Sequence, residues 1–483
     1  MKKTPWGKLA LVFLLSFALF YPSLKYFFTH DDFFLLKISN IRTFGQYLNI
    51  FNIFSAPEGL GMYRPLSMQT YYMLGIKVFN YNPMWLHVIS FLTFFLLIYL
   101  IYRFVVKITN NQEIALVSSL LYATSATHFS HIYFKGAYQE LLMAVFVLAS
   151  LIYYVNYLKS NRLKNYLWVL VFFMLGLASK ENAIILPLMF VVTLLYSFRK
   201  KVVNKKKLKK HLVYLLPMFL VVAMYMYLRL NYFGLPEGDS YVWEFSFRVI
   251  NSGFWYLLWS FNIPEMFVDF MGPGLRLNPN LLNYWGKETV IITSLFVAFG
   301  IGLFILLIKS FQNIYKKYQL IVYFALWFAI FSLPFIFLPL HKFTYYLTLP
   351  LVGIVVLISL ILNLGSKRNI VKYGLVILWI ALSFTTLKLT RSTHWITRGS
   401  ETARKIHEYF ITEDNAKTKV VFYDTKDDKN LPWSPTGVIK DILSDDDYFI
   451  VFQPKIKEVE YIPMKEKEDE NTLYLESRQF LDY

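Results

Sequence analysis

The stretch LHVISFLTFFLLIYLIYRFVV (86–106) contains 21 residues, and only Arg103 among them carries a fixed charge. A helix needs about 20 apolar residues to cross the hydrocarbon core of a bilayer, and this stretch meets that length. Backbone groups in lipid must be hydrogen-bonded within their own segment, so we expect it to be helical. Similar runs recur along the chain, at 9–24, 113–128, 139–158, 165–179, 182–198, 212–230, 289–308, 319–338, 343–363 and 371–388. The sequence therefore predicts an all-α polytopic membrane protein with about eleven transmembrane helices.

The composition agrees with this class. The 483 residues are 56% hydrophobic and 19% aromatic, with a mean hydropathy of +0.43. A soluble protein of this size would be far less apolar. The chain has no cysteine, which excludes disulfides and thiolate metal sites. The first apolar run follows Lys2, Lys3 and Lys8 without a small-residue cleavage pattern, so we interpret it as a retained helix and not as a signal peptide.

Basic residues indicate the orientation of the helices. They concentrate in short loops between apolar runs, at 103–107, 159–164, 199–210, 309–317 and 367–372. This placement is not a nucleic-acid-binding pattern; an excess of Lys and Arg marks the cytoplasmic side of a membrane protein. We therefore expect a cytoplasmic N-terminus in a multi-pass protein. The lysine- and asparagine-rich composition favours the plasma membrane of a prokaryote.

The same parity places two large loops, 25–85 and 231–287, on the outer side. Within the first loop, FGQYLNIFNIF (44–54) and PLSMQTYYMLGIKVF (65–79) have apolar residues at near-helical spacing and predict helices on the membrane surface. SFRVINSGFWYLLWSFNI (246–263) is too polar for a clear span and predicts an interfacial or re-entrant helix. If this segment did cross the membrane, the C-terminal tail would move to the cytoplasmic side.

The composition changes at about residue 395. Residues 395–483 contain 13 Lys/Arg and 19 Asp/Glu, a net charge of −6, whereas the preceding residues carry +24. We predict a transmembrane domain over 1–394 and a small soluble, extracytoplasmic α/β domain over 395–483. Its expected elements are strands at TKVVFYD (418–424), YFIVFQ (448–453) and VEYIPM (459–464), and a capped helix at SPTGVIKDILS (434–444).

Charged side chains collect on the outer side. Of the twelve acidic residues before residue 395, only Glu113 falls on the inner side. Ionisable residues at membrane depth are costly and usually mark function. By parity, one membrane face holds Asp31, Asp32, Tyr63, Arg64, His128, Glu140, Lys180, Glu181, His341 and Lys342.

A carboxylate pair beside several cations suits one type of chemistry. The carboxylate can take a proton from an acceptor hydroxyl, and fixed cations can stabilise the charge that develops on a departing phosphate. A sugar linked to a lipid phosphate offers both a leaving phosphate and an anchor in the bilayer. The aromatic outer helices would line a groove for its polyprenyl chain.

Over about residues 25–200 the chain resembles the GT-C membrane glycosyltransferases, and most closely the protein O-mannosyltransferase-like group. In that group an acidic pair opens the first outer loop, and further motifs follow in a fixed order. The matching residues are Asp31-Asp32, Tyr63-Arg64-Pro65-Leu66, Gly75, Asn82-Pro83, His87, and Ser179-Lys180-Glu181 followed by Pro187.

The chain also departs from the family pattern. In SATHFSH (125–131) only His128 matches the second of the family's histidines, although Glu140 retains a later acid. Late in the chain, Tyr345-Tyr346 stands where the family often has arginine-tyrosine. His341 or Lys342 is the candidate for the missing cation. The tetratricopeptide repeats that some members carry are absent.

The resemblance implies roles for these residues. Asp31 would be the catalytic base, with Asp32 assisting or binding a metal or the acceptor. The donor phosphate would bind Arg64 and Lys180, with Lys342 and His341 as further candidates. The candidate substrate-binding residues are Tyr63, Glu181, His128 and Glu140.

The implied reaction moves a hexose or pentose from a polyprenyl-phosphate donor to a protein, lipid or glycan acceptor, with inversion at the anomeric carbon. Membrane lipids are the other expected partners, and nucleic acid is not one. No strong metal motif is present, and the sequence leaves a divalent-cation requirement open.

Structural and functional alternatives exist. Asp31 and Asp32 could cap the first outer helix, and Lys180 and Glu181 could form a structural ion pair. Another functional class is a transporter or flippase for lipid-linked or acidic solutes, although the inverted repeats and broken helices typical of transporters are not visible. A polymerase or ligase of surface polysaccharide would share the outer-face chemistry.

Overall fold

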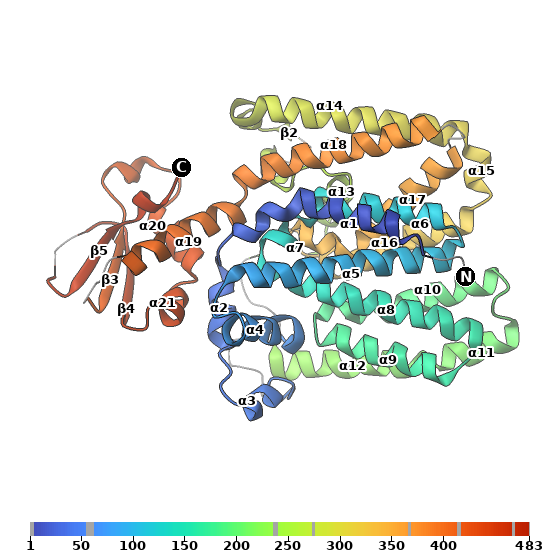
Figure 1. The fold of residues 1–483 in the computed structure, drawn as a ribbon, viewed down its shortest axis with the longest axis horizontal. Helices are drawn as coiled ribbons and strands as arrows, with labels where there is room; N and C mark the ends of the chain where they lie inside the picture. Colours follow the sequence, from blue (N-terminus) through green and yellow to red (C-terminus); the bar gives the residue numbers. More distant parts are fainter. Residues whose placement is uncertain are drawn as a thin grey trace.

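The computed structural model describes residues 4–54, 62–234, 240–272, 276–365, 369–412, 417–465 and 469–482. A bundle of roughly parallel and antiparallel helices forms most of the molecule, and a small sheet with its own helices lies beyond one end of it (Figure 1). The N-terminus lies at the opposite end of the bundle, near α11 (Lys205–Val213) and α15 (Phe311–Tyr315). The helix-connecting segments rich in lysine therefore gather away from the sheet.

Among the described residues, eight helical segments are long and apolar enough to cross a membrane, judged by length and composition. They contain α1 (Trp6–Phe20), α5 (Pro83–Thr109), α8 (Tyr138–Ser160), α10 (Leu186–Arg199), α12 (Leu216–Leu228), α14 (Asn280–Lys309), α16 (Tyr318–Ile336) and α18 (Asn369–Thr393). Shorter apolar helices are α9 (Leu163–Leu177) and α17 (Pro350–Gly365), and α6 (Gln112–Ala123) covers most of another apolar run. The all-α polytopic class is confirmed, and the count of eleven spans stays a prediction.

Short helices form the two long loops, 25–85 and 231–287. The expected surface helices of the first loop are α3 (Phe44–Asn49), and η2 (Pro65–Thr70) continuing into α4 (Tyr71–Lys77). The second loop contains α13 (Arg248–Trp259), whose 12 residues extend about 18 Å, well short of a bilayer core. The remaining short elements are η1 (Tyr21–Lys25), α2 (Asp31–Ile38), η3 (Ala126–His128), α7 (Phe129–Tyr133), η4 (Lys135–Ala137), η5 (Glu181–Ile185), η6 (Arg229–Phe233), η7 (Glu265–Phe270), the antiparallel pair β1 (Met271–Gly272) and β2 (Arg276–Leu277), and η9 (Thr344–Thr348).

The tail begins with the amphipathic helix α19 (Trp395–Thr412) and contains a parallel three-stranded sheet in the order β4-β3-β5. Its elements are β3 (Lys419–Tyr423), η10 (Asp427–Asn430), α20 (Pro435–Leu443), α21 (Asp447–Phe452), β4 (Glu458–Ile462), β5 (Thr472–Glu476) and η11 (Ser477–Phe480). The strands expected at 418–424 and 459–464 and the helix expected at 434–444 are confirmed.

The strand expected at 448–453 is wrong, because this segment is helix α21. Tyr448 and Phe452, four residues apart, lie on one helical face and pack their rings against Phe33 of α2, at 5.3 and 6.1 Å. The sequence analysis missed the third strand, β5, which lies beyond the charged segment 465–470.

The tail packs against the first outer loop. The Lys37 ammonium lies 2.6 Å from the Asp447 carboxylate, and the backbone N–H of His30 donates to the carbonyl of Ile442 at 2.7 Å. The ring of Phe27 stacks on His407 with 4.7 Å between centroids. These contacts hold α2 between the bundle and the tail, as its position in Figure 1 shows.

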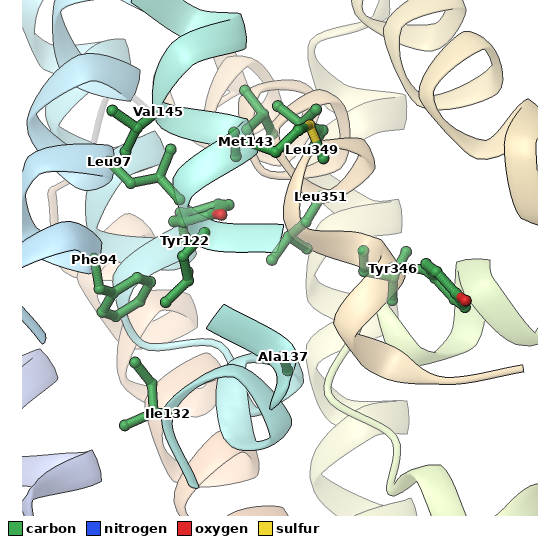
Figure 2. Packing of buried hydrophobic residues seen from close by; sticks show 14 of the residues in the cluster. Phe94, Leu97, Tyr122, Ile132, Ala137, Met143, Val145, Tyr346, Leu349 and Leu351 are labelled. Atoms are coloured by element: carbon green, nitrogen blue, oxygen red, sulfur yellow. The ribbon is translucent and has the colours of Figure 1, made fainter. Parts of the chain in front are cut away.

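The centre of the bundle is packed with large apolar side chains. Figure 2 shows Phe94, Leu97 and Tyr122 facing Leu349 and Leu351 across the core. The Tyr122 hydroxyl donates to the carbonyl of Thr348 at 2.8 Å, so its polar atom is satisfied inside the apolar core. This packing fixes the position of η9, which carries Tyr345 and Tyr346.

Helices α16 and α17 approach closely at Gly353, and this contact is testable. A Cβ atom at Gly353 would lie 2.6 Å from the carbonyl oxygen of Phe324, so Gly353→Ala must move the α16 backbone. We expect the variant to lose about 1–3 kcal/mol of stability. Gly300→Ala in α14 is the matched control, because its Cβ meets nothing within 4 Å. Thermal denaturation in detergent should lower the midpoint for Gly353→Ala alone; equal midpoints for both variants would contradict the tight contact.

Candidate active site

A cavity of about 570 Å³ lies at the end of the bundle that carries α2. Its walls come from both outer loops and from the ends of several long helices. Aromatic side chains form much of the surface, including Phe134, Trp243, Phe245, Phe335, Tyr345 and Tyr346. The charged residues that line it are Asp31, Arg64, Lys180, Glu181 and Arg229. Four of the ten candidate residues from the sequence thus meet in one cavity.

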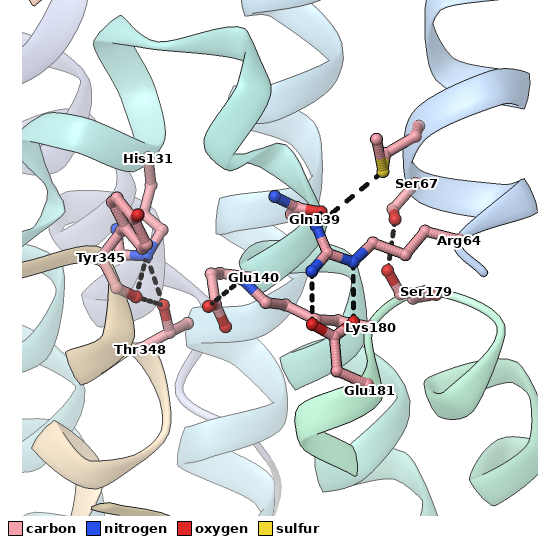
Figure 3. A network of polar contacts seen from close by, with 11 residues as sticks. Arg64, Ser67, His131, Gln139, Glu140, Ser179, Lys180, Glu181, Tyr345 and Thr348 are labelled. Atoms are coloured by element: carbon pink, nitrogen blue, oxygen red, sulfur yellow. Dashed lines mark hydrogen bonds and ion pairs between the residues drawn. The ribbon is translucent and has the colours of Figure 1, made fainter. Parts of the chain in front are cut away.

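Arg64 forms a bidentate ion pair with the carboxylate of Glu181. Its Nε donates to Glu181 Oε2 at 2.7 Å and its Nη2 to Glu181 Oε1, while Nη1 donates to the side chain of Gln139 (Figure 3). The geometry is the bidentate pairing that fixes a guanidinium plane most strongly. Two further bonds tie the segments together: the backbone N–H of Leu66 donates to Ala178, and the Ser67 hydroxyl donates to the carbonyl of Ser179.

Lys180 forms a second buried pair beside the first. Its ammonium lies 2.6 Å from Glu140 Oε1, and both side chains are at most 4% exposed. The ammonium also lies 5.0 Å from the centroid of the Tyr346 ring and 5.6 Å from that of Tyr345. Burying an ion costs desolvation free energy, which a partner charge and hydrogen bonds must offset. The rings of Tyr345 and Tyr346 add cation–π contacts to the Lys180 ammonium.

Arg229 is a site residue that the sequence analysis missed. It follows α12 directly, is buried, and lines the cavity. Among the described residues, its Nη1 has no hydrogen-bond partner. The signal that could have found it is a basic residue at the outer end of the apolar run 212–230, where positive charge is scarce.

Asp31 is the first residue of α2 and reaches the cavity. Its side chain remains accessible there, although protein atoms surround it. This burial raises the pKa of the Asp31 carboxyl above its usual range, and the nearby positive charge of Arg64 opposes the rise. The carboxylate is therefore more basic than that of an ordinary exposed aspartate.

Asp32 lies elsewhere. Adjacent residues of a helix point in different directions, and Asp32 is fully buried beside α4. It accepts hydrogen bonds from the backbone N–H of Thr29 at 3.1 Å and from the hydroxyl of Tyr72. Burial raises its pKa to about 6, opposed by Lys135 and by the Tyr72 bond. Asp32 does not line the cavity, and its contacts brace the start of α2 against α4.

Several other candidates also lie outside the lining. The Tyr63 hydroxyl donates to the carbonyl of Phe51 at 3.0 Å, and the His128 ring nitrogen lies 2.8 Å from the carbonyl of Tyr122. The Lys342 ammonium donates to Asn251 at 3.3 Å. None of these three side chains lines the cavity. Glu140 does not line the cavity either, and its carboxylate pairs with Lys180.

His341 is close to the site without entering it. Its ring packs 4.1 Å from that of Tyr241, which lines the cavity, and its Nδ1 lies 3.2 Å from the Ser240 hydroxyl. Burial, together with Lys180 and Arg64, lowers the pKa of His341 to about 4. A lowered pKa favours the neutral imidazole, and the role of His341 as a phosphate contact stays a prediction.

The described part of the chain contains no candidate metal site. No group of three or more His, Asp or Glu side chains there is arranged to hold an ion. In the cavity, Glu181 is engaged by Arg64, which leaves Asp31 as a single carboxylate.

Part of the sequence matches a known protein family. The sequence model of the dolichyl-phosphate-mannose-protein mannosyltransferase family matches residues 64–227 of the 483. The matched part contains Arg64, Glu140, Lys180 and Glu181, whereas Asp31 precedes it and the tail follows it. No curated protein matches the chain.

The match and the cavity agree in their chemistry. The family acts on a sugar that is linked to a polyprenyl phosphate, and the matched residues place two fixed cations against an aromatic wall. The match over residues 64–227 supports a GT-C mannosyltransferase-like protein, and together with the long apolar helices it supports a multi-pass membrane glycosyltransferase that uses a polyprenyl-phosphate sugar donor.

Proposed function

We propose that the protein transfers a hexose or pentose to a hydroxyl of a protein, lipid or glycan acceptor in one inverting displacement, on the outer face of the membrane. The observation that carries this proposal is the single cavity lined by Asp31, Arg64 and Lys180. It combines a basic carboxylate, two fixed cations and an aromatic surface for the lipid-linked donor.

In the proposed step the acceptor oxygen attacks the anomeric carbon while its proton passes to Asp31. The bond between that carbon and the phosphate oxygen breaks, and both electrons leave with the polyprenyl phosphate. Because the pKa of Asp31 is raised, its carboxylate is a better proton acceptor than an ordinary aspartate. Direct displacement from the far side inverts the anomeric configuration and needs no covalent enzyme intermediate.

The two cations have separate tasks in this step. Arg64 is fixed by Glu181 and Gln139, so its charge is oriented before the donor arrives. Preorganised charge of this kind stabilises a transition state without reorganisation at the moment of reaction. Lys180 has three N–H donors and a single carboxylate partner in Glu140, so it retains donors for the phosphate.

The orientation follows from charge. The N-terminus, α11 and α15 lie at one end of the bundle, and α2 and the tail lie at the other (Figure 1). Positive residues favour the cytoplasmic side, and this supports an outer-face location for the cavity and the 395–483 domain. A prokaryotic plasma membrane fits this arrangement.

Asp31→Asn tests the catalytic base. Loss of the proton acceptor should slow release of polyprenyl phosphate from labelled donor by about 100-fold or more. Donor binding should change little, because the amide has the size of the carboxyl. Asp441→Asn, at an exposed carboxyl of α20, is the control and should keep wild-type turnover. Undiminished turnover in Asp31→Asn would refute its role.

The pH dependence of turnover provides a second test. Asp31 must be ionised to act as a base, so turnover should fall as the pH is lowered through its pKa. Because burial raises the pKa of Asp31, this fall in turnover should occur at a pH above the ordinary aspartate pKa of about 3.9. Arg64→Met removes a charge that favours the carboxylate, and should move the fall to higher pH in single-turnover donor cleavage. A fall at the same pH in both proteins would show that another group titrates.

Lys180→Ala tests the phosphate contact. Removing this ammonium should weaken binding of the polyprenyl-phosphate sugar at least about tenfold, because a buried charge contact is lost. Lys342→Ala is the matched control, since Lys342 is also an outer-side lysine but does not line the cavity. Donor affinity measured by equilibrium binding should fall in the first variant and not in the second; unchanged affinity in Lys180→Ala would exclude a phosphate contact.

A further inference from the structure

A second cavity, of about 390 Å³, lies at the opposite end of the bundle. It is bounded by the last turns of α5, α8, α10 and α17 and by the start of α16. In Figure 1 this is the end that carries α11 and α15, away from α2. The cavity is thus separate from the glycosyl-transfer site and takes no part in the chemistry described above.

Four lysines from different elements converge on this cavity, Lys107, Lys159, Lys200 and Lys317. No acidic residue lines it. In the part of the chain that the structure describes, none of the four forms an ion pair with a carboxylate. Lys107 instead donates to the neutral side chain of Asn156 at 2.6 Å. Four like charges around one hollow repel each other, so the arrangement gains most from a bound anion.

An adjoining hollow extends the positive region. It shares Lys107 and Lys159 with the first cavity and adds Arg103. Glu113 also lines it, but this carboxylate is engaged by the buried ammonium of Lys372. The carboxylate therefore does not neutralise the four lysines of the first cavity.

Much of the remaining lining is apolar, although Thr109, Asn110, Asn111 and Ser197 also line the cavity. Ile108, Ile114 and Val155 line the cavity together with three leucines, Leu320, Leu360 and Leu364. A small soluble anion needs only the cations, whereas a lipid also buries its glycerol and the first carbons of its chains. Basic pockets between transmembrane helices are suited to phosphate headgroups for this reason.

We propose that this cavity binds the phosphate headgroup of an anionic glycerophospholipid, with Lys107, Lys159, Lys200 and Lys317 as its cations. The lipid comes from the leaflet at the lysine-rich end of the bundle. Its phosphate lies among the four ammonium groups, and its acyl chains leave along the apolar wall. The bound lipid relieves the repulsion among the lysines and ties together the ends of four helices.

Lipid binding to the purified full-length protein tests the proposal. Native mass spectrometry with phosphatidylglycerol and phosphatidylcholine of the same chains should show tight retention of the anionic lipid only. Lys159→Gln combined with Lys317→Gln should weaken phosphatidylglycerol binding by about tenfold or more. The matched control combines Lys205→Gln with Lys209→Gln in α11, two exposed lysines outside the cavity. Equal losses in both double variants would overturn a specific site.

Two further measurements are needed. One distinguishes a lipid headgroup from a soluble phosphate, and the other detects variants that are misfolded. Glycerol phosphate, which lacks acyl chains, should compete poorly with phosphatidylglycerol. Equal binding of the two would overturn the lipid assignment in favour of a soluble anion. Each variant is also checked for its thermal midpoint without added lipid. If the double variant is unfolded, Lys200→Gln alone is measured, and retention equal to wild type in this variant would contradict the proposal.

Discussion

The site depends on the pairing of buried charges at the end of the bundle. Arg64 with Glu181 and Lys180 with Glu140 place two cations and two carboxylates in a region where water is largely excluded. Neither charge of a pair could be removed without leaving the other uncompensated, which is costly inside a protein. The pairs therefore join the loop 25–85, α8 and the start of η5, and they set the electrostatics of the cavity before any substrate binds.

Much of the architecture could be predicted because the bilayer restricts it. Long apolar runs such as 86–106 can only be helices, and α5 covers that run completely. The ordered motifs around Arg64 and Lys180 likewise predicted two segments that the fold brings together, through Ser67 and Ser179. These are features that a local pattern or a motif order encodes.

Other features depend on contacts that no local pattern contains. Asp31 and Asp32 look equivalent in sequence, yet one helical step sends the first to the cavity and the second to Tyr72. The apolar run 448–453 suits a strand as well as a helix, and its packing on Phe33 decides for the helix. Arg229 could not be predicted as a site residue from the sequence, because the cavity that it lines is built from segments far apart in the chain.

The contact between the tail and α2 has a consequence for biogenesis. Lys37 and Asp447 lie 410 positions apart, so at ordinary rates of about 5–20 residues per second the ribosome needs about 20–80 s to supply the second after the first. Throughout that interval α2, which carries Asp31, lacks its contacts with the tail. The contacts that hold α2 against the tail are therefore completed only after the last part of the chain has been synthesised.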